Sequence, residues 1–206
     1  SALCRALASG RTADSSYVIM EDLPGCSLAA VLSPGTRVPW HRAARWIGGL
    51  CGGPALLHAR GFVHRDVKPG NVILGEDGRV IVLDFGLART GLDSRVSQQS
   101  DPEGAELSER LTRPGSVLGT PAYMAPEQLR GRWRGFGPGP DLYSLGCVAF
   151  EVCCGRLPFE GDNLFEIAHL QMSGDLPELE PRMAVPAGFH DWVARMLSKN
   201  PQDRFQ

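Results

Sequence analysis

The sequence has no excess of charge of either sign. Lysine and arginine number 21 and aspartate and glutamate number 23 among 206 residues. Because a nucleic acid or an anionic membrane is bound mainly through a surplus of cations, this balance argues against both as principal partners of the segment. We therefore expect binding at local sites, with no nucleic-acid partner.

The sequence also lacks a long hydrophobic run and any cysteine pair with metal-binding spacing. No stretch approaches the roughly 20 apolar residues that cross a bilayer, so we expect no signal peptide and no membrane contact in this segment. Most of the six cysteines sit within apolar runs, which predicts buried, reduced thiols. Reduced thiols are typical of a reducing compartment, and we predict a cytoplasmic location.

What is present is an ordinary globular composition, with 43% hydrophobic and 21% charged residues. Apolar segments predict a strand at 17–23 and a weaker one at 3–7, with the turn pair Pro24-Gly25 ending the extended run. Two further apolar pieces, 71–74 and 80–86, flank the turn signal Glu-Asp-Gly and predict a hairpin.

Helical periodicity follows at 41–61, interrupted by four glycines and a proline. An interior proline costs about 3 kcal/mol and a glycine about 1 kcal/mol relative to alanine, so we predict a kink or break at 52–54. The segment 141–155 is apolar nearly all round and predicts a buried helix, and 189–197 predicts an amphipathic one. The polar stretch 90–117 predicts a mobile loop containing, at most, a short helix around 103–111. The count is two leading strands, one hairpin and four or five helices.

The chemistry-bearing motif is "HRDVKPGN" at 64–71, followed by "DFG" at 84–86 and "APE" at 125–127. In this order and spacing the motifs resemble the eukaryotic-type serine/threonine protein kinases. The resemblance implies an α+β protein kinase-like fold, represented mainly by its helical large lobe, and phosphoryl transfer from ATP with Mg²⁺. It also implies a catalytic loop at 64–71 and an activation segment at 84–127.

The residue types agree with that chemistry. Phosphoryl transfer requires a positioned hydroxyl, neutralised phosphate charge and magnesium held by hard oxygen ligands. Asp66 is the candidate catalytic base, and Lys68 the candidate cation beside the transferred group. Asn71 and Asp84 are the candidate magnesium ligands.

The resemblance further implies supporting residues. Asp141 resembles the carboxylate that accepts backbone N–H groups of the catalytic loop, and Glu127 with Arg204 resembles a partnered ion pair. His64 and Phe85 resemble stacked members of an internal hydrophobic spine. Taken singly, each motif is weak: Asp141 is equally compatible with a helix N-cap and Arg204 with a solvated surface charge.

For nucleotide binding, the stretch "YVIMEDLPG" resembles a hinge. Met20 would be the gatekeeper, the backbone from Glu21 to Leu23 would meet adenine, and Ile73 would close the adenine slot from below. Lys68, Thr120 and the phrase "GTPAYMAPE" resemble the serine/threonine pattern, with the Thr120 hydroxyl bridging Asp66 and Lys68. The expected partners are therefore ATP and proteins bearing serine or threonine. The wider sequence around these motifs is most similar to that of bacterial members of the family.

The sequence departs from the family at its front. No G-x-G-x-x-G occurs and no lysine precedes Lys68, so the phosphate-fixing lysine and its glutamate partner are absent from this segment. We expect 1–24 to be a remnant of the small lobe with the hinge, and 25–206 to be the large lobe. The chain is then a fragment of an active kinase that is inactive by itself; a non-catalytic, pseudokinase-like binding or regulatory module is the alternative.

The activation segment is the second departure, because it is longer than is usual for the family. Its tip is hydrophilic and rich in serine. Arg65, beside Asp66, could pair with a phosphate there and order the loop through charge-assisted hydrogen bonds. Ser116 and Thr112 are the expected phosphorylation sites.

Overall fold

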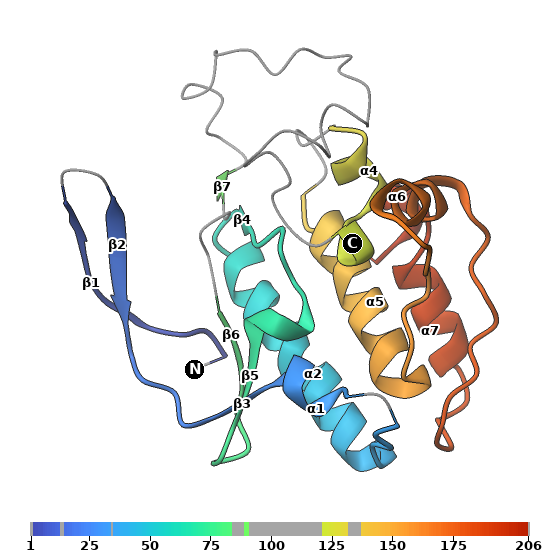
Figure 1. Ribbon diagram of the computed structural model, residues 1–206, viewed down its shortest axis with the longest axis horizontal. Coiled ribbons are helices and arrows are strands. Elements are labelled where there is room, and N and C mark those ends of the chain that lie inside the picture. The colour runs from blue at the N-terminus through green and yellow to red at the C-terminus, as the bar shows by residue number, and fades with distance from the viewer. Residues whose placement is uncertain are drawn as a thin grey trace.

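The computed structural model describes residues 2–12, 15–33, 35–83, 89–90, 121–131 and 137–205, and only the backbone of residues 16, 89 and 90. Helices form the main body, and small sheets lie along one side of it (Figure 1). The α+β prediction is confirmed. The helices are α1 (Leu28–Val31), α2 (Trp40–His58), α4 (Pro126–Leu129), α5 (Gly139–Cys154), α6 (Leu164–Ser173) and α7 (Phe189–Met196), with short 3-10 turns at Pro69–Asn71, Pro121–Tyr123 and Pro201–Asp203.

The first two strands form a hairpin of their own. β1 (Ala6–Arg11) pairs antiparallel with β2 (Ser16–Met20) and with no other described strand. The strand predicted at 17–23 is confirmed up to Met20, whereas the one predicted at 3–7 begins later. In Figure 1 this hairpin stands apart from the helical body. Five of its large apolar side chains are about half exposed: Leu7, Tyr17, Val18, Ile19 and Met20.

A second sheet has the order β3 (Gly25–Ser27), β5 (Val72–Gly75), β6 (Val80–Val82) and is antiparallel throughout. The predicted hairpin is confirmed, with Gly78 at φ +81° in its turn, where a side chain would be strained. The extended run of β2 already ends at Met20, before the predicted turn pair Pro24-Gly25, and Gly25 begins the new strand β3. A Cβ on Gly25 would collide with the Leu74 carbonyl oxygen, so glycine allows the close approach of the two strands.

Helix α2 is continuous from Trp40 to His58, so the break predicted at 52–54 is wrong. The reason is tertiary. A Cβ atom added to Gly49 would lie 2.6 Å from the Val80 side chain, and one added to Gly53 would lie 2.6 Å from the Val82 side chain. The glycines therefore let the helix lie directly on β6, and the burial gained there offsets their low helix propensity.

The central helix α5 is buried along nearly its whole length and ends at Gly155 with φ +67°, as the apolar run predicted. Helix α7 buries Phe189, Val193 and Met196, which confirms its predicted apolar face. Trp192 stacks on Phe189 with ring centroids 5.8 Å apart. Together α2, α5 and α7 lie side by side and form the core (Figure 1).

All six cysteines are free. Four are buried, Cys51 is half-buried and Cys26 is exposed, so the prediction of buried thiols holds for four of them. No helix within the described ranges is long and apolar enough to cross a membrane. The loop predicted over 90–117 lies outside the described residues except for Thr90, and the short helix around 103–111 lies wholly outside them.

Candidate active site

The loop 64–68 lies between two elements that hold its ends. β4 (Phe62–Val63) precedes it and pairs with β7 (Arg89–Thr90), and the 3-10 turn Pro69–Asn71 follows it and leads into β5. Arg65 has φ +68°, a left-handed conformation that a non-glycine residue adopts only when its surroundings impose it.

Asp141 imposes this backbone conformation. From the first turn of α5, its carboxylate accepts the His64 N–H at 2.8 Å and the Arg65 N–H at 2.7 Å. The side chain is 1% exposed, so both bonds are shielded from water. The predicted role of Asp141 as an acceptor for the loop backbone is confirmed. His64 is also buried, and its Nε2 lies 2.8 Å from the Leu83 carbonyl oxygen.

His58 was not identified from the sequence. It is the last residue of α2, and its Nε2 lies 2.7 Å from Oδ2 of Asp141. The carboxylate therefore joins the end of α2 to the catalytic loop and α5. The only signal in the sequence was a histidine in a last helical turn, a common and unspecific position.

Asp66, Lys68 and Asn71 converge at one carboxylate oxygen. Asp66 Oδ2 accepts from Lys68 Nζ at 2.7 Å and from Asn71 Nδ2 at 2.8 Å. The Asp66 side chain is 10% exposed and that of Lys68 24%. Within the described ranges, no residue donates a hydrogen bond to the other carboxylate oxygen, Oδ1.

The amide of Asn71 is fixed by two hydrogen bonds from its nitrogen. Its nitrogen donates to the Asp66 carbonyl oxygen at 2.9 Å as well as to the carboxylate, which leaves Oδ1 without a donor among the described residues. Leu83, the residue before Asp84, donates its N–H to the Asn71 carbonyl at 2.8 Å. Asp84 itself, like Phe85, lies outside the described residues. An amide oxygen next to the start of an aspartate-bearing segment fits the hard donor set that Mg²⁺ requires.

The predicted adenine-binding residues lie where β2 leaves its hairpin. Met20 ends β2 and is 46% exposed. The Glu21 N–H donates to the Arg5 carbonyl at 3.0 Å, so Glu21 can offer only its carbonyl oxygen to a ligand. No described residue bonds that carbonyl or the Leu23 N–H. Ile73 lies in β5 opposite Ser27 and is half-buried.

Comparison with known proteins decides the family. The protein kinase domain model matches residues 1–206. The chain belongs to this family. It is 34% identical to the serine/threonine-protein kinase PknL of Mycobacterium tuberculosis over 190 residues, which cover 92% of this chain and 43% of that relative. It is 31% identical to the serine/threonine-protein kinase PknB of Mycobacterium leprae over 191 residues, 92% of this chain and 28% of that relative.

The chain thus spans less than half the length of these curated relatives. Both are bacterial proteins, which confirms the resemblance to bacterial serine/threonine kinases, and the family confirms the kinase-like fold. Protein kinase domains in general use ATP and Mg²⁺.

In this kinase domain the motif Ala125-Pro126-Glu127 is tied to the C-terminal residues. Arg204 Nη1 lies 2.6 Å from Glu127 Oε1, and Nη2 lies 2.9 Å from Oε2, with the two side chains 0% and 3% exposed. Arg204 also donates to the carbonyls of Ser198 and Gly139. The predicted ion pair of Glu127 with Arg204 is confirmed, and the alternative that Arg204 is a solvated surface charge is excluded.

Gln128, which the sequence did not indicate, connects this motif to the loop 64–71. Its Nε2 donates to the Arg65 carbonyl at 3.0 Å, and its Oε1 accepts the Ala125 N–H at 3.0 Å. Both bonds are to backbone groups, so no pairing of residue types in the sequence indicated them. The loop peptide at Arg65 is therefore held from both sides, by Asp141 and by Gln128.

A half-buried hydroxyl–carboxylate pair lies beside the same segment. Tyr123 donates its hydroxyl to Glu151 Oε2 at 2.7 Å, and Ser144 donates to the Tyr123 carbonyl at 2.7 Å. Burial raises the pKa of Glu151 and, together with the adjacent carboxylate, raises the pKa of Tyr123. Thr120 and the expected phosphorylation sites Ser116 and Thr112 lie outside the described residues.

Proposed function

We propose that this chain carries the catalytic loop of a kinase that transfers the γ-phosphoryl group of ATP to serine or threonine hydroxyls of proteins. The observation that carries the proposal is the geometry of Asp66. One of its oxygens is held by Lys68 and Asn71, and the other meets no described donor. This arrangement suits a group that orients a hydroxyl and accepts its proton.

Each residue then has a defined part. Asp66 accepts the proton of the attacking hydroxyl through Oδ1, and Lys68 would lie beside the transferred phosphoryl group and offset its developing charge. Asn71 and Asp84 would hold Mg²⁺ through their side-chain oxygens. Bound Mg-ATP supplies the phosphoryl group and neutralises part of its charge. Thr120 would bridge Asp66 and Lys68 by its hydroxyl.

The nucleotide would meet the hinge. The Glu21 carbonyl and the Leu23 N–H are the unused backbone groups there, with Ile73 below the adenine and Met20 at the gatekeeper position. Serine/threonine specificity is supported by Lys68 and by the names of the mycobacterial relatives.

The activity is proposed for the full-length protein, because the chain spans only 43% and 28% of its relatives. The exposed apolar hairpin β1–β2 supports the prediction that residues 1–24 are part of a larger small lobe, since a two-stranded hairpin with apolar faces is only marginally stable in water. We propose that this hairpin packs within a larger sheet in the full-length protein.

The test is Asp66→Asn in the full-length protein, assayed for Mg²⁺-dependent transfer of labelled phosphate from ATP to protein serine and threonine. Transfer should fall by about 100-fold or more, because the proton acceptor is lost while size and hydrogen bonding are kept. Asp191→Asn, at an exposed site on α7, is the matched control and should leave transfer unchanged. Circular dichroism of both variants should match the wild type.

The alternative is a binding or regulatory module without transfer. Full-length protein that binds ATP but transfers no phosphate under any of these conditions would establish the module and refute the enzyme.

A further inference from the structure

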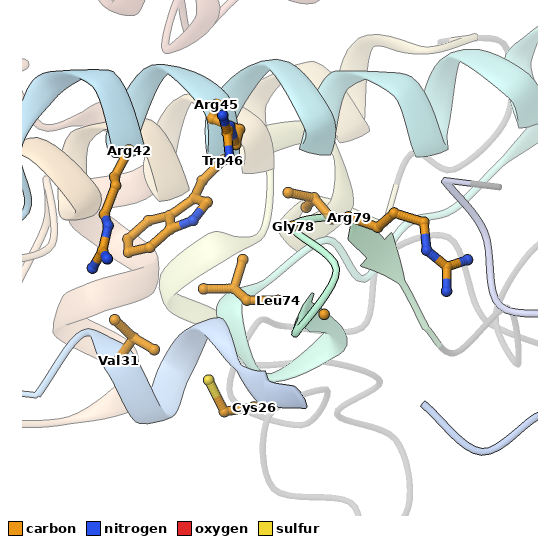
Figure 2. Close-up of a pocket in the computed structure, with 10 residues that line it drawn as sticks. Cys26, Val31, Arg42, Arg45, Trp46, Leu74, Gly78 and Arg79 are labelled. Atoms are coloured by element: carbon orange, nitrogen blue, oxygen red, sulfur yellow. The ribbon is translucent and has the colours of Figure 1, made fainter. Parts of the chain in front are cut away.

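A pocket of about 280 Å³ lies between α2 and the β5–β6 hairpin, with α1 on its far side (Figure 2). Its apolar lining is formed by Val31, Trp46, Leu74 and Val80. None of the lining residues belongs to the loop 64–71, so the pocket is distinct from the candidate active site.

The packing of α2 explains why a pocket forms here. Gly49 and Gly53 hold the helix directly against Val80 and Val82, as described above. One turn earlier on the same face the helix presents Trp46, which cannot approach the hairpin so closely. The helix and the hairpin are both anchored in the core, so the walls of the pocket are preformed.

The interior of the pocket is bordered by apolar side chains. Trp46 and Leu74 are half-buried, and Val80 is 6% exposed. In Figure 2 the side chains of Trp46, Leu74 and Val31 border the same space. The volume is slightly below the roughly 300–1,000 Å³ of sites for whole small molecules, and therefore suits a single large apolar side chain.

Two exposed arginines, Arg42 and Arg45, lie on the rim. Neither guanidinium group forms a hydrogen bond or an ion pair with the residues that the structure describes. Arg42 lies beside the Trp46 ring (Figure 2), and Arg45 Nη1 lies 3.6 Å from where a Cβ on Gly78 would be.

A third arginine on the rim, Arg79, already forms an ion pair with Asp77. Its Nε lies 2.5 Å from Asp77 Oδ2, and its guanidinium points away from the pocket in Figure 2. Glu76 and Asp77 are the acidic groups of the same turn, and Asp77 is compensated by Arg79. Among the described residues of the rim, the arginines with no carboxylate partner are therefore Arg42 and Arg45, which line the same apolar pocket.

We propose that this pocket docks an acidic segment of the kinase's protein substrates. One apolar side chain of the segment enters between Trp46 and Leu74, and flanking carboxylates pair with Arg42 and Arg45. The proposal rests on the proposed function, since the substrate of that reaction is a polypeptide. Docking apart from the catalytic loop raises the effective concentration of the acceptor hydroxyl.

The experiment measures binding without phosphate transfer. A fluorescein-labelled peptide in which aspartates and glutamates flank a central Leu-Phe pair is titrated with the full-length protein, and fluorescence anisotropy gives Kd. The double variant Arg42→Glu/Arg45→Glu should weaken binding by at least about tenfold, because attraction becomes repulsion. Arg60→Glu makes one such charge reversal beyond the other end of α2 and should leave Kd unchanged.

Two further controls locate the peptide. Peptides with Asn and Gln for the acids, or with Ser-Gly for Leu-Phe, should each bind more weakly. Cys26 lines the pocket and is the exposed cysteine, so saturating peptide should slow its alkylation by N-ethylmaleimide in wild type but not in the double variant.

Absence of binding to wild type, equal affinity of the double variant, or unprotected Cys26 would each overturn the docking proposal. Because the assay needs no catalysis, a protein that fails the Asp66 test but binds this peptide would refute the proposed reaction and not the acidic-peptide site. A protein that transfers phosphate but does not bind the peptide would refute docking alone.

Discussion

The loop 64–71 and the β1–β2 hairpin are both short segments, yet the structure holds them in different ways. The loop is fixed by buried polar contacts from residues far away in the chain, with Asp141 on one side and Gln128 on the other. The hairpin is fixed by its own ladder and exposes its apolar side chains. A strained backbone such as that of Arg65 needs the first kind of support, because local pairing could not impose it.

The largest effect is expected at the support of the loop. Asp141→Ala removes the acceptor of the His64 and Arg65 N–H groups and leaves buried donors unpaired, so the free energy of unfolding should fall by about 3 kcal/mol. Urea denaturation measures the loss, and hydrogen exchange at those two amides should accelerate. A loss as small as that of a surface substitution would show that the loop does not depend on α5.

The next effect concerns the helix that ends beside the loop. Gly53→Ala should destabilise the protein by about 1–3 kcal/mol, because the new methyl group meets Val82. Gly48→Ala is the matched control: no atom lies within 4 Å of its added Cβ, so it should stabilise the protein by up to about 1 kcal/mol. Thermal unfolding of both variants measures the difference, and equal shifts would contradict the close packing.

A smaller effect, visible through pH, is expected at Glu151. Its pKa is raised above 4.5 in the folded protein by burial, so the folded state holds its proton more tightly than the unfolded chain does. Stability conferred by this group is present below pH 4.5 and is lost as pH rises through the raised value. Glu151→Gln keeps an acceptor for Tyr123 and should gain stability over the wild type as pH rises. Urea midpoints between about pH 4 and pH 8 measure this; a difference that does not vary with pH would mean ordinary ionisation of Glu151.

The smallest effect is expected in the hairpin. Ile19→Thr in the 206-residue chain should change the free energy of unfolding by less than about 0.5 kcal/mol, because the side chain is already 50% exposed. In the full-length protein, where we propose that the hairpin packs in a larger sheet, the same substitution should cost about 1 kcal/mol or more. If Ile19→Thr changed the free energy of unfolding by the same small amount in both proteins, the hairpin would be exposed in the full-length protein as well, and that proposal would be contradicted.

Several elements could be predicted because their signals are local. The turn Glu76–Gly78, the apolar run of α5 and the apolar face of α7 each depend on neighbours within a few residues. The motif 64–71 likewise carries the residues that converge at Asp66, since Lys68 and Asn71 follow it closely in the chain.

Other features could not be predicted because they depend on a partner far away in the chain. Proline and glycine propensities argued for a break in α2, and the contact of Gly49 and Gly53 with β6 overrode them. His58 and Gln128 act on partners that the sequence does not place near them. Arg42 and Arg45 are ordinary helix cations in the sequence, and only the folded structure places them at an apolar pocket.

The amino-acid sequence alone therefore determined the family, the catalytic motif and the elements built from short-range patterns, because hydrophobic periodicity and turn chemistry act over a few residues. Only the tertiary structure decided the continuity of α2, the restraint of Arg65 from two sides and the pocket lined by Trp46. These features depend on which surfaces approach closely in three dimensions. The shape and charge of such contacts cannot be predicted from one segment of the sequence, because the contacting residues lie far apart in the chain.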